Sequence, residues 1–293
     1  MKLNTVKSFI NNVRNLKVAV IGETIIDEFV KVSYEGQSMK SICPVFKLEG
    51  KVQQQMGGAL AIANHIKDFV KSVKIISNTN SEIVKTRFVD VNNHKKHIEI
   101  NKFDTDNFPE IKVNTDDYDV VIVADFGHGF CEKLMINDGF HLMCQTNSNN
   151  FGFNRISKWK NHKKKTVCLD LREASLQMNT KFQFQSEKEI FELYNYEMKA
   201  ENLFLTIGGA GAIYTNGKKI VKQKSYPSEI VDTIGAGDTF LAFATLSSVV
   251  SHQDISTIMQ VPALAASLST TWLANEKSVT KKNLFAYANR FIS

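Results

Sequence analysis

The run Asp119 to Ala124, Asp-Val-Val-Ile-Val-Ala, constrains the fold more than any other stretch of the chain. All residues after the first are apolar, which predicts a strand buried on both faces, and β-branched residues favour a strand over a helix. Short apolar runs recur at 17–21, 73–77, 166–169 and 202–208. Helical patterns lie between or after these runs, at 60–70, 131–144, 186–200, 241–250, 254–275 and 280–291. Strands alternating with helices predict an α/β fold with a mostly parallel central sheet covered by helices on both faces.

Two other segments do not fit this sheet. Residues 28–55 alternate irregularly around Pro44, and residues 82–91 alternate with a period of two, which is typical of half-exposed strands. We expect a small β flap, formed from about 28–55 and 82–101. With no internal repeat and no linker composition, residues 1–293 are expected to form a single domain that carries this flap. Asn216-Gly217 further predicts a hairpin between strands at 212–215 and 219–224.

The composition suits a folded globular protein with a mild excess of positive charge. Hydrophobic residues make up 43% of the 293 residues, and the formal net charge is +6. Such a balance fits phosphorylated small molecules and is also compatible with nucleic acid. The basic cluster Lys163 to Lys165 is short and has no aromatic residues among its lysines, so a solvated loop is favoured and no nucleic-acid partner is expected.

The cysteines and the N-terminus bear on the cellular compartment. Cys43, Cys131, Cys144 and Cys168 form no Cys-x-x-Cys pair, which predicts neither a zinc site nor a disulfide framework. Residues 1–16 lack the apolar core of a signal peptide, and no apolar run is long enough to span a bilayer. We therefore expect a cytoplasmic protein without a membrane partner.

The clearest candidate for chemistry is Asp232 to Phe240, Asp-Thr-Ile-Gly-Ala-Gly-Asp-Thr-Phe, which precedes the helical run 241–250. Glycines before a helix expose the amides of its first turn to an anion, and the helix dipole adds partial positive charge. Asp238 follows these glycines and is placed to act as a base toward a hydroxyl that attacks a phosphoryl group. Helix capping by Thr233 or Asp238 is the alternative.

Two aspartates follow buried strands, and a glycine pair precedes a helix. Asp27 comes just after the first strand, and Asp125 opens the loop Asp-Phe-Gly-His-Gly at 125–129. Ligands gather at the carboxyl ends of parallel strands, so both aspartates are candidate ligand contacts, although a solvated turn would also explain Asp27. Gly57 and Gly58 allow either the close approach of a ligand or tight helix packing.

Two further pairs carry charge. Lys85 and Arg87 share one face of the strand 82–91, where they bind either a phosphate or only solvent. Asp170 and Glu173 stand three residues apart where a strand meets a helix. Two carboxylates at that spacing hold Mg²⁺ through water molecules, or they form a capped helix start.

Three glycine stretches together resemble those of the ribokinase-like (PfkB) carbohydrate kinases: Gly-Gly-Ala at 57–59, Thr-x-Gly-x-x-Gly at 206–211 and Gly-Ala-Gly-Asp at 235–238. Their order and spacing cover nearly the whole chain. Within that family the chain looks most like the bacterial D-glycero-β-D-manno-heptose-7-phosphate kinases. The stretches that carry this closer likeness are Gly-Glu-Thr-Ile-Ile-Asp at 22–27, Ile-Val-Lys-Thr-Arg-Phe-Val at 83–89 and Ala-Asp-Phe-Gly-His-Gly at 124–129.

The resemblance implies a ribokinase-like three-layer αβα sandwich with a β flap. It also implies transfer of the γ-phosphoryl group of ATP, with Mg²⁺, to a sugar hydroxyl. For a heptose kinase this is the anomeric hydroxyl of a sugar that already carries a phosphate, as a precursor of surface polysaccharide. A homodimer through the flap is a further implication. By position, the resemblance makes Asp238 the general base and places the anion hole at Gly235, Ala236 and Gly237. It places the nucleotide loop at Thr206, Gly208 and Gly211, and the Mg²⁺ motif at Asp170 and Glu173. The sugar site is matched by Asp27, Gly57, Gly58 and Asp125, and the candidates for binding the substrate's phosphate are Lys85 and Arg87.

The chain departs from the family pattern at three places: Ala61 replaces a frequent asparagine, His128 replaces a lysine common in the heptose kinases, and the segment between Ser77 and Glu82 is short. Two alternatives to a heptose kinase stay open on these grounds. One is a kinase for another sugar or for a nucleoside, and the other is a catalytically weak, ligand-binding relative.

Overall fold

The computed structural model describes residues 3–78, 82–104, 108–146, 153–179, 186–196, 198–226, 229–250 and 255–291. Among these residues, eight strands form one sheet in the order β15-β14-β13-β12-β11-β9-β1-β5. Neighbours from β13 to β5 are parallel, whereas β14 and β15 join as an antiparallel hairpin. The strands are β1 Lys17–Gly22, β5 Ser72–Ile76, β9 Val120–Asp125, β11 His141–Cys144, β12 Lys164–Asp170, β13 Ala200–Thr206, β14 Ala212–Thr215 and β15 Ile220–Gln223.

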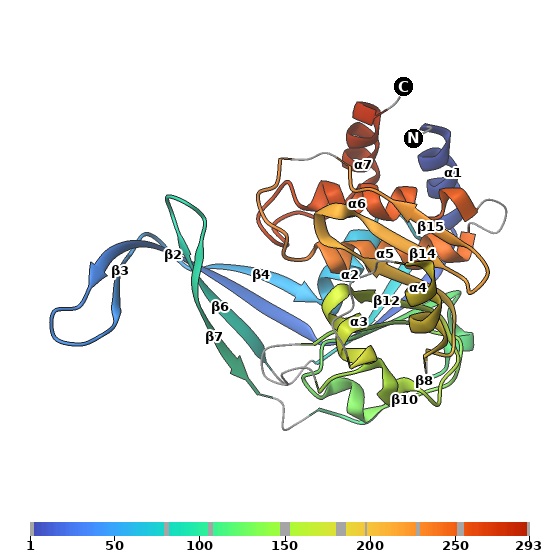
Figure 1. The fold of residues 1–293 in the computed structure, drawn as a ribbon, viewed down its shortest axis with the longest axis horizontal. Helices are drawn as coiled ribbons and strands as arrows, with labels where there is room; N and C mark the ends of the chain where they lie inside the picture. The colour runs from blue at the N-terminus through green and yellow to red at the C-terminus, as the bar shows by residue number, and fades with distance from the viewer. Residues whose placement is uncertain are drawn as a thin grey trace.

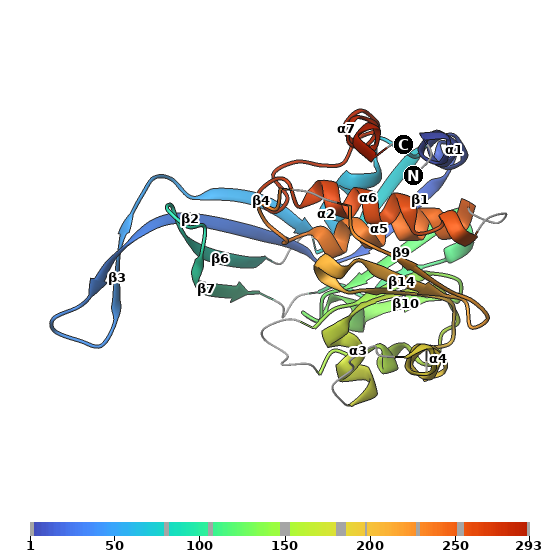
Figure 2. The ribbon, with the colours of Figure 1, turned by 45° about the horizontal axis from the view of Figure 1, so that its top comes forward.

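Helices cover both faces of this sheet (Figure 2). One face carries α1 Leu3–Val13, α2 Ala59–Ile66, α5 Ala236–Val250, α6 Gln260–Ser269 and α7 Lys281–Ala288, and the other carries α3 Leu171–Met178 and α4 Glu187–Asn195. The core lies between these layers, where Val20, Ile122 and Phe243 are fully buried. Burial of apolar residues on both sides of β9 explains why its sequence is continuously apolar.

A second sheet forms the flap, which extends away from the helices and the central sheet (Figure 1). Its strands are β2 Thr24–Gln37, β3 Pro44–Leu48, β4 Gln53–Gly58, β6 Ile83–Asp90 and β7 Lys96–Phe103. The order is β3-β2-β6-β7, and β4 pairs with the first half of β2. A small pair, β8 Ile111–Val113 and β10 Leu134–Ile136, completes the strands.

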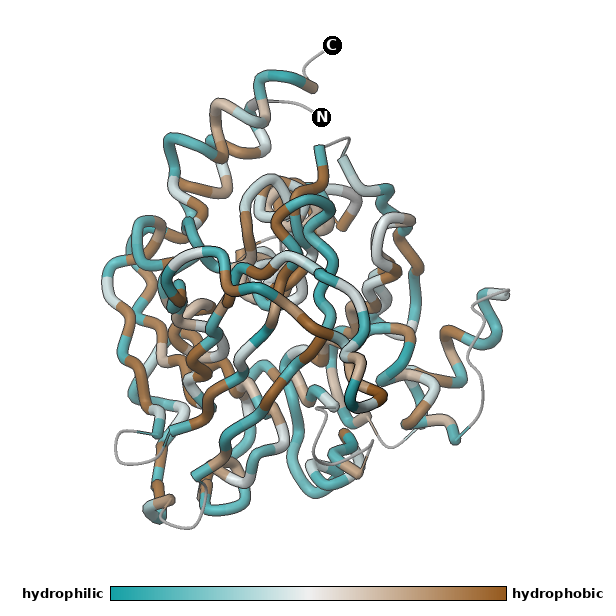
Figure 3. The backbone as a smooth tube through the Cα atoms, turned by 90° about the vertical axis from the view of Figure 1, so that its left-hand side faces the viewer, coloured by the Kyte–Doolittle hydropathy of each residue, from teal (hydrophilic) through white to brown (hydrophobic). Residues whose placement is uncertain are grey.

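The register of the flap separates two faces. Asp27 lies opposite Lys85, and Phe29 lies opposite Arg87. On the other face, Glu28 and Thr86 lie among apolar side chains, of which Ile98 and Ile100 are exposed. Figure 3 views the molecule from the flap end and shows hydrophilic and hydrophobic stretches along the backbone. A pleated strand sends successive side chains to opposite faces, so one face of the flap is charged and the other is largely apolar.

The expected architecture is confirmed: the fold is ribokinase-like, with a mostly parallel sheet between two helical layers and a flap. The strand β9, the flap strands and the hairpin at Asn216-Gly217 lie where the sequence indicates. Residues 79–81, in the short segment before Glu82, lie outside the described residues.

The helix expected at 131–144 is wrong. The 3₁₀ turn η2 Phe130–Lys133 leads into β10, and β11 begins at His141. Gly139 between them has φ 99°, a left-handed conformation that ends any regular helix. The apolar residues of this stretch form two short strands instead.

Other boundaries shift. Gly57 and Gly58 belong to β4, the helix after them ends at Ile66, and the helix expected at 186–200 ends at Asn195 because Ala200 starts β13. The helix expected at 254–275 is α6 alone, preceded by the 3₁₀ turn η5 Ile255–Thr257, while Asp254 lies outside the described residues. The other 3₁₀ turns are η1 Thr115–Asp117, η3 Ile156–Trp159, η4 Gly208–Ala210 and η6 Asn289–Phe291.

All four cysteines are free, and Cys43 alone among them is exposed. Within the described ranges, each helix is too short or too polar to cross a bilayer.

Candidate active site

A cavity of about 690 Å³ opens where the flap meets the carboxyl edge of the central sheet. Its lining combines flap residues, the ends of β12 and β13, and the first turn of α5. Apolar side chains and a few polar groups in one concave site are typical of small-molecule binding. The expected site residues on its wall are Asp27, Gly58, Lys85, Arg87, Asp170, Glu173, Thr206, Gly208, Gly211, Gly235, Ala236, Gly237 and Asp238.

Asp238 lies in the first turn of α5, and only 9% of it is exposed. Burial raises the pKa of Asp238 to about 7; the charge of Asp27 adds to the shift and that of Lys85 opposes it. Gly235 has φ 79°, and a Cβ there would clash with the side chain of Asn275. The glycine is therefore needed both for the turn and for close packing. The result is a carboxyl group beside the open amide end of a long helix.

A buried network fixes the start of α5. The backbone amide of Val279 donates to Nδ1 of His65 at 3.0 Å, so the other ring nitrogen, Nε2, carries the proton. Nε2 lies 3.0 Å from Oγ1 of Thr239, and this hydroxyl donates to the carbonyl of Gly235 at 3.0 Å. Burial lowers the pKa of His65 to about 4, which keeps the ring neutral. The sequence did not suggest this role for His65.

The flap side of the cavity is organised by Arg87. Its guanidinium lies 2.5 Å from Asp27 and 2.8 Å from Glu99, so two carboxylates compensate one positive charge. Gly57 does not line the cavity, but a Cβ there would clash with the carboxylate of Asp27. Gly57 thus permits the position of Asp27, and Arg87 fixes it.

Lys85 differs from Arg87, because no ion pair with its ammonium is found among the described residues. Burial lowers the pKa of Lys85, and the charge of Glu99 opposes this shift. The side chain lines the cavity and interacts electrostatically with Asp27 and Asp238. It is a cation available to an anionic ligand.

Asp170 and Glu173 form a capping box at the start of α3. Oδ1 of Asp170 accepts from the amide of Glu173 at 2.8 Å, and Oε2 of Glu173 accepts from the amide of Asp170 at 2.8 Å. A capped helix start is one of the two arrangements that the sequence predicts for this pair, and the other is a Mg²⁺ site. Burial, followed by the charge of Asp170, raises the pKa of Glu173 to about 8. Both side chains still line the cavity, so capping does not remove them from it.

The loop after β13 forms the opposite wall. Gly208 and Gly211 have φ 54° and 107°, and a Cβ at Gly211 would clash with the carbonyl of Gln223 on β15. Farther along this wall the lining becomes apolar, with Tyr226, Ile230, Ala263 and Ala266. A glycine loop beside an apolar surface suits a phosphate next to a flat aromatic base.

Asp125 does not lie on the wall of the cavity, in contrast to the expectation that it contacts a ligand. Its carboxylate is fully buried, 2.7 Å from Nζ of Lys158, and accepts from the indole of Trp159 at 2.9 Å. The neighbouring Phe126 lines the cavity instead. Strand alternation explains the difference, because successive residues at the end of β9 point to opposite sides.

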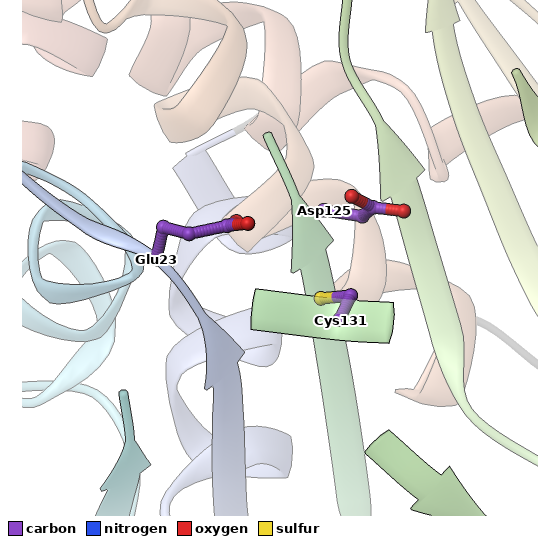
Figure 4. Close-up of side chains that lie close together, drawn as sticks. All are labelled: Glu23, Asp125 and Cys131. Atoms are coloured by element: carbon purple, nitrogen blue, oxygen red, sulfur yellow. The ribbon is translucent and has the colours of Figure 1, made fainter. Parts of the chain in front are cut away.

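Glu23, Asp125 and Cys131 lie close together, with donor atoms within 4.8 Å of one another (Figure 4). The carboxylate of Glu23 accepts from three backbone amides in the loop 126–130. Burial raises the pKa of the Cys131 thiol, which disfavours the thiolate that binds metals. Because N–H groups already occupy both carboxylates, the cluster fits a role in holding the loop and not a metal site.

Comparisons with known proteins agree with this geometry. Residues 146–277 match the model of the pfkB family carbohydrate kinases. Ribokinase of Bacillus subtilis (strain 168) is 39% identical over 82 residues, a match that spans 28% of this chain and 27% of that protein.

Solved structures extend the likeness to the whole fold. Ribokinase from Thermotoga maritima has a TM-score of 0.66 at 14% identity, covering 94% of this chain and 99% of its own. Arabidopsis thaliana ribokinase, solved with ribose and ATP, has a TM-score of 0.63 at 15% identity, covering 96% and 100%. A nucleoside kinase from Methanocaldococcus jannaschii has a TM-score of 0.63 at 13% identity, covering 95% and 99%.

The fold of the chain is ribokinase-like, and residues 146–277 are similar to the pfkB family of carbohydrate kinases. The region that matches the family model includes the loop 206–211 and the first turn of α5, and the rest of the cavity comes from the flap and the N-terminal half. Asn275 lines the cavity as well, beside Gly235, and the sequence did not single it out.

Proposed function

We propose that the chain belongs to the pfkB family and is an ATP-dependent sugar kinase, acting in the cytoplasm on a hydroxyl of a phosphorylated sugar, with heptose 7-phosphate as the favoured acceptor. The observation that carries the proposal is the position of Asp238. Its carboxyl group lies at the amide end of α5 on the wall of a cavity that also holds Asp27. A base beside an anion hole and opposite a polar, acceptor-sized surface suits transfer of a phosphoryl group to a hydroxyl.

In this proposal Asp238 takes the proton of the attacking hydroxyl. A pKa of about 7 matches that task near neutral pH, because the ionised base is available and still binds a proton well. The amides of Gly235 to Gly237 and the dipole of α5 stabilise the negative charge on the transferred group. Asp27, held by Arg87, accepts hydrogen bonds from the sugar, and the flap excludes water from the reacting atoms.

The residues present fit Mg²⁺ as well. Asp170 and Glu173 offer only oxygen ligands, and the raised pKa of Glu173 indicates a buried carboxyl group that a nearby cation would help to ionise. These two residues would hold the ion through water molecules. When bound, the ion supplies positive charge that neutralises the phosphates of ATP.

ATP is expected along the wall formed by Thr206, Gly208 and Gly211. The glycine loop suits the phosphates, and the apolar lining around Tyr226 and Ala263 suits the adenine. The Arabidopsis thaliana ribokinase with ATP and a Cryptococcus neoformans ribokinase with ADP have the same fold and support this choice of donor.

The choice of a phosphorylated acceptor rests on Lys85. Arg87 was also a candidate for the substrate's phosphate, but Asp27 and Glu99 already compensate its charge. Lys85 lines the cavity and forms no ion pair within the described part of the chain, so an anionic substituent would supply a direct partner. A neutral sugar or a nucleoside would leave this cation unpaired.

The test is ADP release from ATP and Mg²⁺ across heptose 7-phosphate, hexose phosphates, free sugars and nucleosides. We expect ADP release with a phosphorylated sugar. The variant Lys85→Met should raise the KM for that sugar about tenfold or more. Lys102→Met, which changes an exposed flap lysine, is the matched control. Release with free sugars or nucleosides alone would refute the phosphorylated acceptor. Nucleotide binding without release from any acceptor would favour a catalytically weak relative.

A homodimer through the outer face of the flap is the remaining part of the proposal. Met56, Ile98 and Ile100 are each at least 39% exposed there, on the face opposite to Asp27 and Lys85. A second copy would cover these apolar side chains. By light scattering, the wild type should have the mass of a dimer and Ile100→Lys that of a monomer. A monomeric wild type would contradict the proposal.

A further inference from the structure

The flap contacts the loop that leads into α5 through an ion pair. Nζ of Lys96, at the start of β7, lies 2.7 Å from Oδ1 of Asp232. The carboxylate is almost fully buried, with 5% of the Asp232 side chain exposed, whereas 34% of the Lys96 side chain is exposed. The other oxygen, Oδ2, is buried and accepts no hydrogen bond from the described residues. Lys96 therefore supplies the cation that compensates this buried charge.

The same oxygen of Asp232 shapes the loop. Oδ1 accepts from the amide of Thr233 at 2.7 Å and from the amide of Ile234 at 3.2 Å. The next residue is Gly235, which begins the anion hole. One carboxylate oxygen therefore links the flap lysine directly to the backbone next to Gly235.

A shift in register brings Lys96 to this position. Phe88 lies opposite Ile98, but Val89 lies opposite Lys96 and not His97. In an uninterrupted antiparallel pair His97 would occupy that place, and Lys96 would point to the outer face of the flap. The irregularity thus directs a charged side chain inward, which is a recognised use of β-bulges.

Two other contacts join the flap to the same region. Phe29 and Val89 pack with Ala274, Ile234 and Leu273 in a small cluster separate from the main core.

Gln55 of β4 makes the second contact. Its Oε1 accepts from the amide of Asn275 at 2.7 Å, and the side chain of Asn275 packs against Gly235. The flap, which carries Asp27 and Lys85, is thereby tied to both loops that surround the anion hole.

We propose that Lys96 is a positioning residue that acts through Asp232. Its ion pair holds the loop before Gly235 so that the amides of Gly235 to Gly237 point correctly only when the flap is in place. This inference rests on the proposed phosphoryl transfer, because those amides are the ones that would stabilise the transferred group. Misplacement of such groups by about 1 Å costs up to about 10²-fold in rate.

The first test compares Lys96→Met with Lys102→Met, which removes an exposed lysine at the other end of the same strand. We expect Lys96→Met to lower kcat about tenfold or more, with KM for ATP changed less than about twofold. Lys102→Met should behave like the wild type. Equal kinetics for the two variants would overturn the proposal.

A double-mutant cycle with Asp232→Asn shows whether Lys96 acts through Asp232. The amide oxygen of asparagine still accepts from Thr233 and Ile234 but leaves no buried charge, so adding Lys96→Met in that background should change kcat less than about threefold. The same loss of kcat in both backgrounds would mean that Lys96 acts by another route and would refute the proposal.

Hydrogen exchange separates this inference from the proposed activity. In Lys96→Met, amides in the segment 232–237 should exchange about tenfold faster than in the wild type or in Lys102→Met, even without substrate. If no acceptor is phosphorylated, this measurement still tests the coupling by itself. Unchanged exchange in the segment would sink the positioning role whatever the outcome of the kinase assay.

Discussion

The perturbation Asp238→Asn tests the chemistry and the electrostatics of the site together. Asp238 is buried at the start of α5, and its pKa is raised from 3.8 to about 7. In the proposed reaction its carboxylate is the base, so the variant should lose about 10²-fold or more in kcat while ATP binding stays nearly intact. Wild-type kcat/KM should rise with pH through about 7, as Asp238 loses its proton.

The same pKa predicts a change in stability with a defined sign. Above pH 4 the unfolded chain has released the proton of Asp238, whereas the folded protein keeps it until about pH 7. The unfolded state therefore binds fewer protons, and the free energy of unfolding falls as pH rises through this window. Between pH 5.5 and pH 7, at 1.36 kcal/mol per pH unit, the contribution of Asp238 is about 2 kcal/mol. Asparagine does not titrate, so the variant lacks this contribution.

The assay is urea unfolding of both proteins at pH 5.5 and pH 8.5, beside a kinase assay at each pH. Burial also raises the pKa of Glu23 to about 7 and that of Glu173 to about 8, so the wild type loses more stability than Asp238 alone explains. The difference between the two proteins isolates Asp238: the loss should be about 2 kcal/mol smaller in Asp238→Asn. Equal losses would show that Asp238 is already ionised at low pH, and unchanged turnover would remove it from the mechanism.

Three further variants address other parts of the site. Glu173→Gln should raise the Mg²⁺ concentration required for half-maximal activity, and an unaltered Mg²⁺ titration would count against that role. Asp125→Asn breaks the buried pair with Lys158 and should cost about 3 kcal/mol in urea unfolding, while KM for the acceptor stays the same; a raised KM would return Asp125 to the substrate site. Gly211→Ala forces a Cβ onto the carbonyl of Gln223, so the Kd for ATP should rise about tenfold by titration calorimetry, with an unchanged Kd excluding this loop from the nucleotide site.

The central strands could be predicted from sequence because their signal is local. β1 and β9 are short apolar runs that end in Gly22 and Asp125, and β9 is the clearest example. The stretch 131–144 was misjudged because apolar residues close together are compatible with a helix as well as with two short strands. Only Gly139 marks the break between β10 and β11, and its left-handed conformation is not visible in a hydrophobic pattern.

The residue types predict where in the fold the site lies more reliably than they predict which side chains line the cavity. The rule that ligands gather at strand ends placed Asp125 at the correct edge of the sheet, but it could not tell which side of the strand Asp125 faces. For Asp170 and Glu173, helix capping and Mg²⁺ binding do not exclude each other, since the capping box forms on the wall of the cavity. His65 and Asn275 were missed because their partners, Thr239 and Gln55, are more than 170 residues away in sequence.

The flap shows why register, which sequence patterns specify only weakly, matters for function here. Its charged face carries Asp27, Lys85 and Arg87 toward the cavity, and its opposite face carries exposed apolar side chains. A slip of one residue would exchange these faces, burying isoleucines in a phosphate site and exposing its charges. Because both faces are in use, only one register is compatible with the site. The irregularity in the pairing of β6 with β7 is then needed to turn Lys96 inward as well. A residue inserted into or removed from β7 near His97 should therefore disrupt the ion pair with Asp232 while leaving the pairing of Asp27 with Arg87 intact.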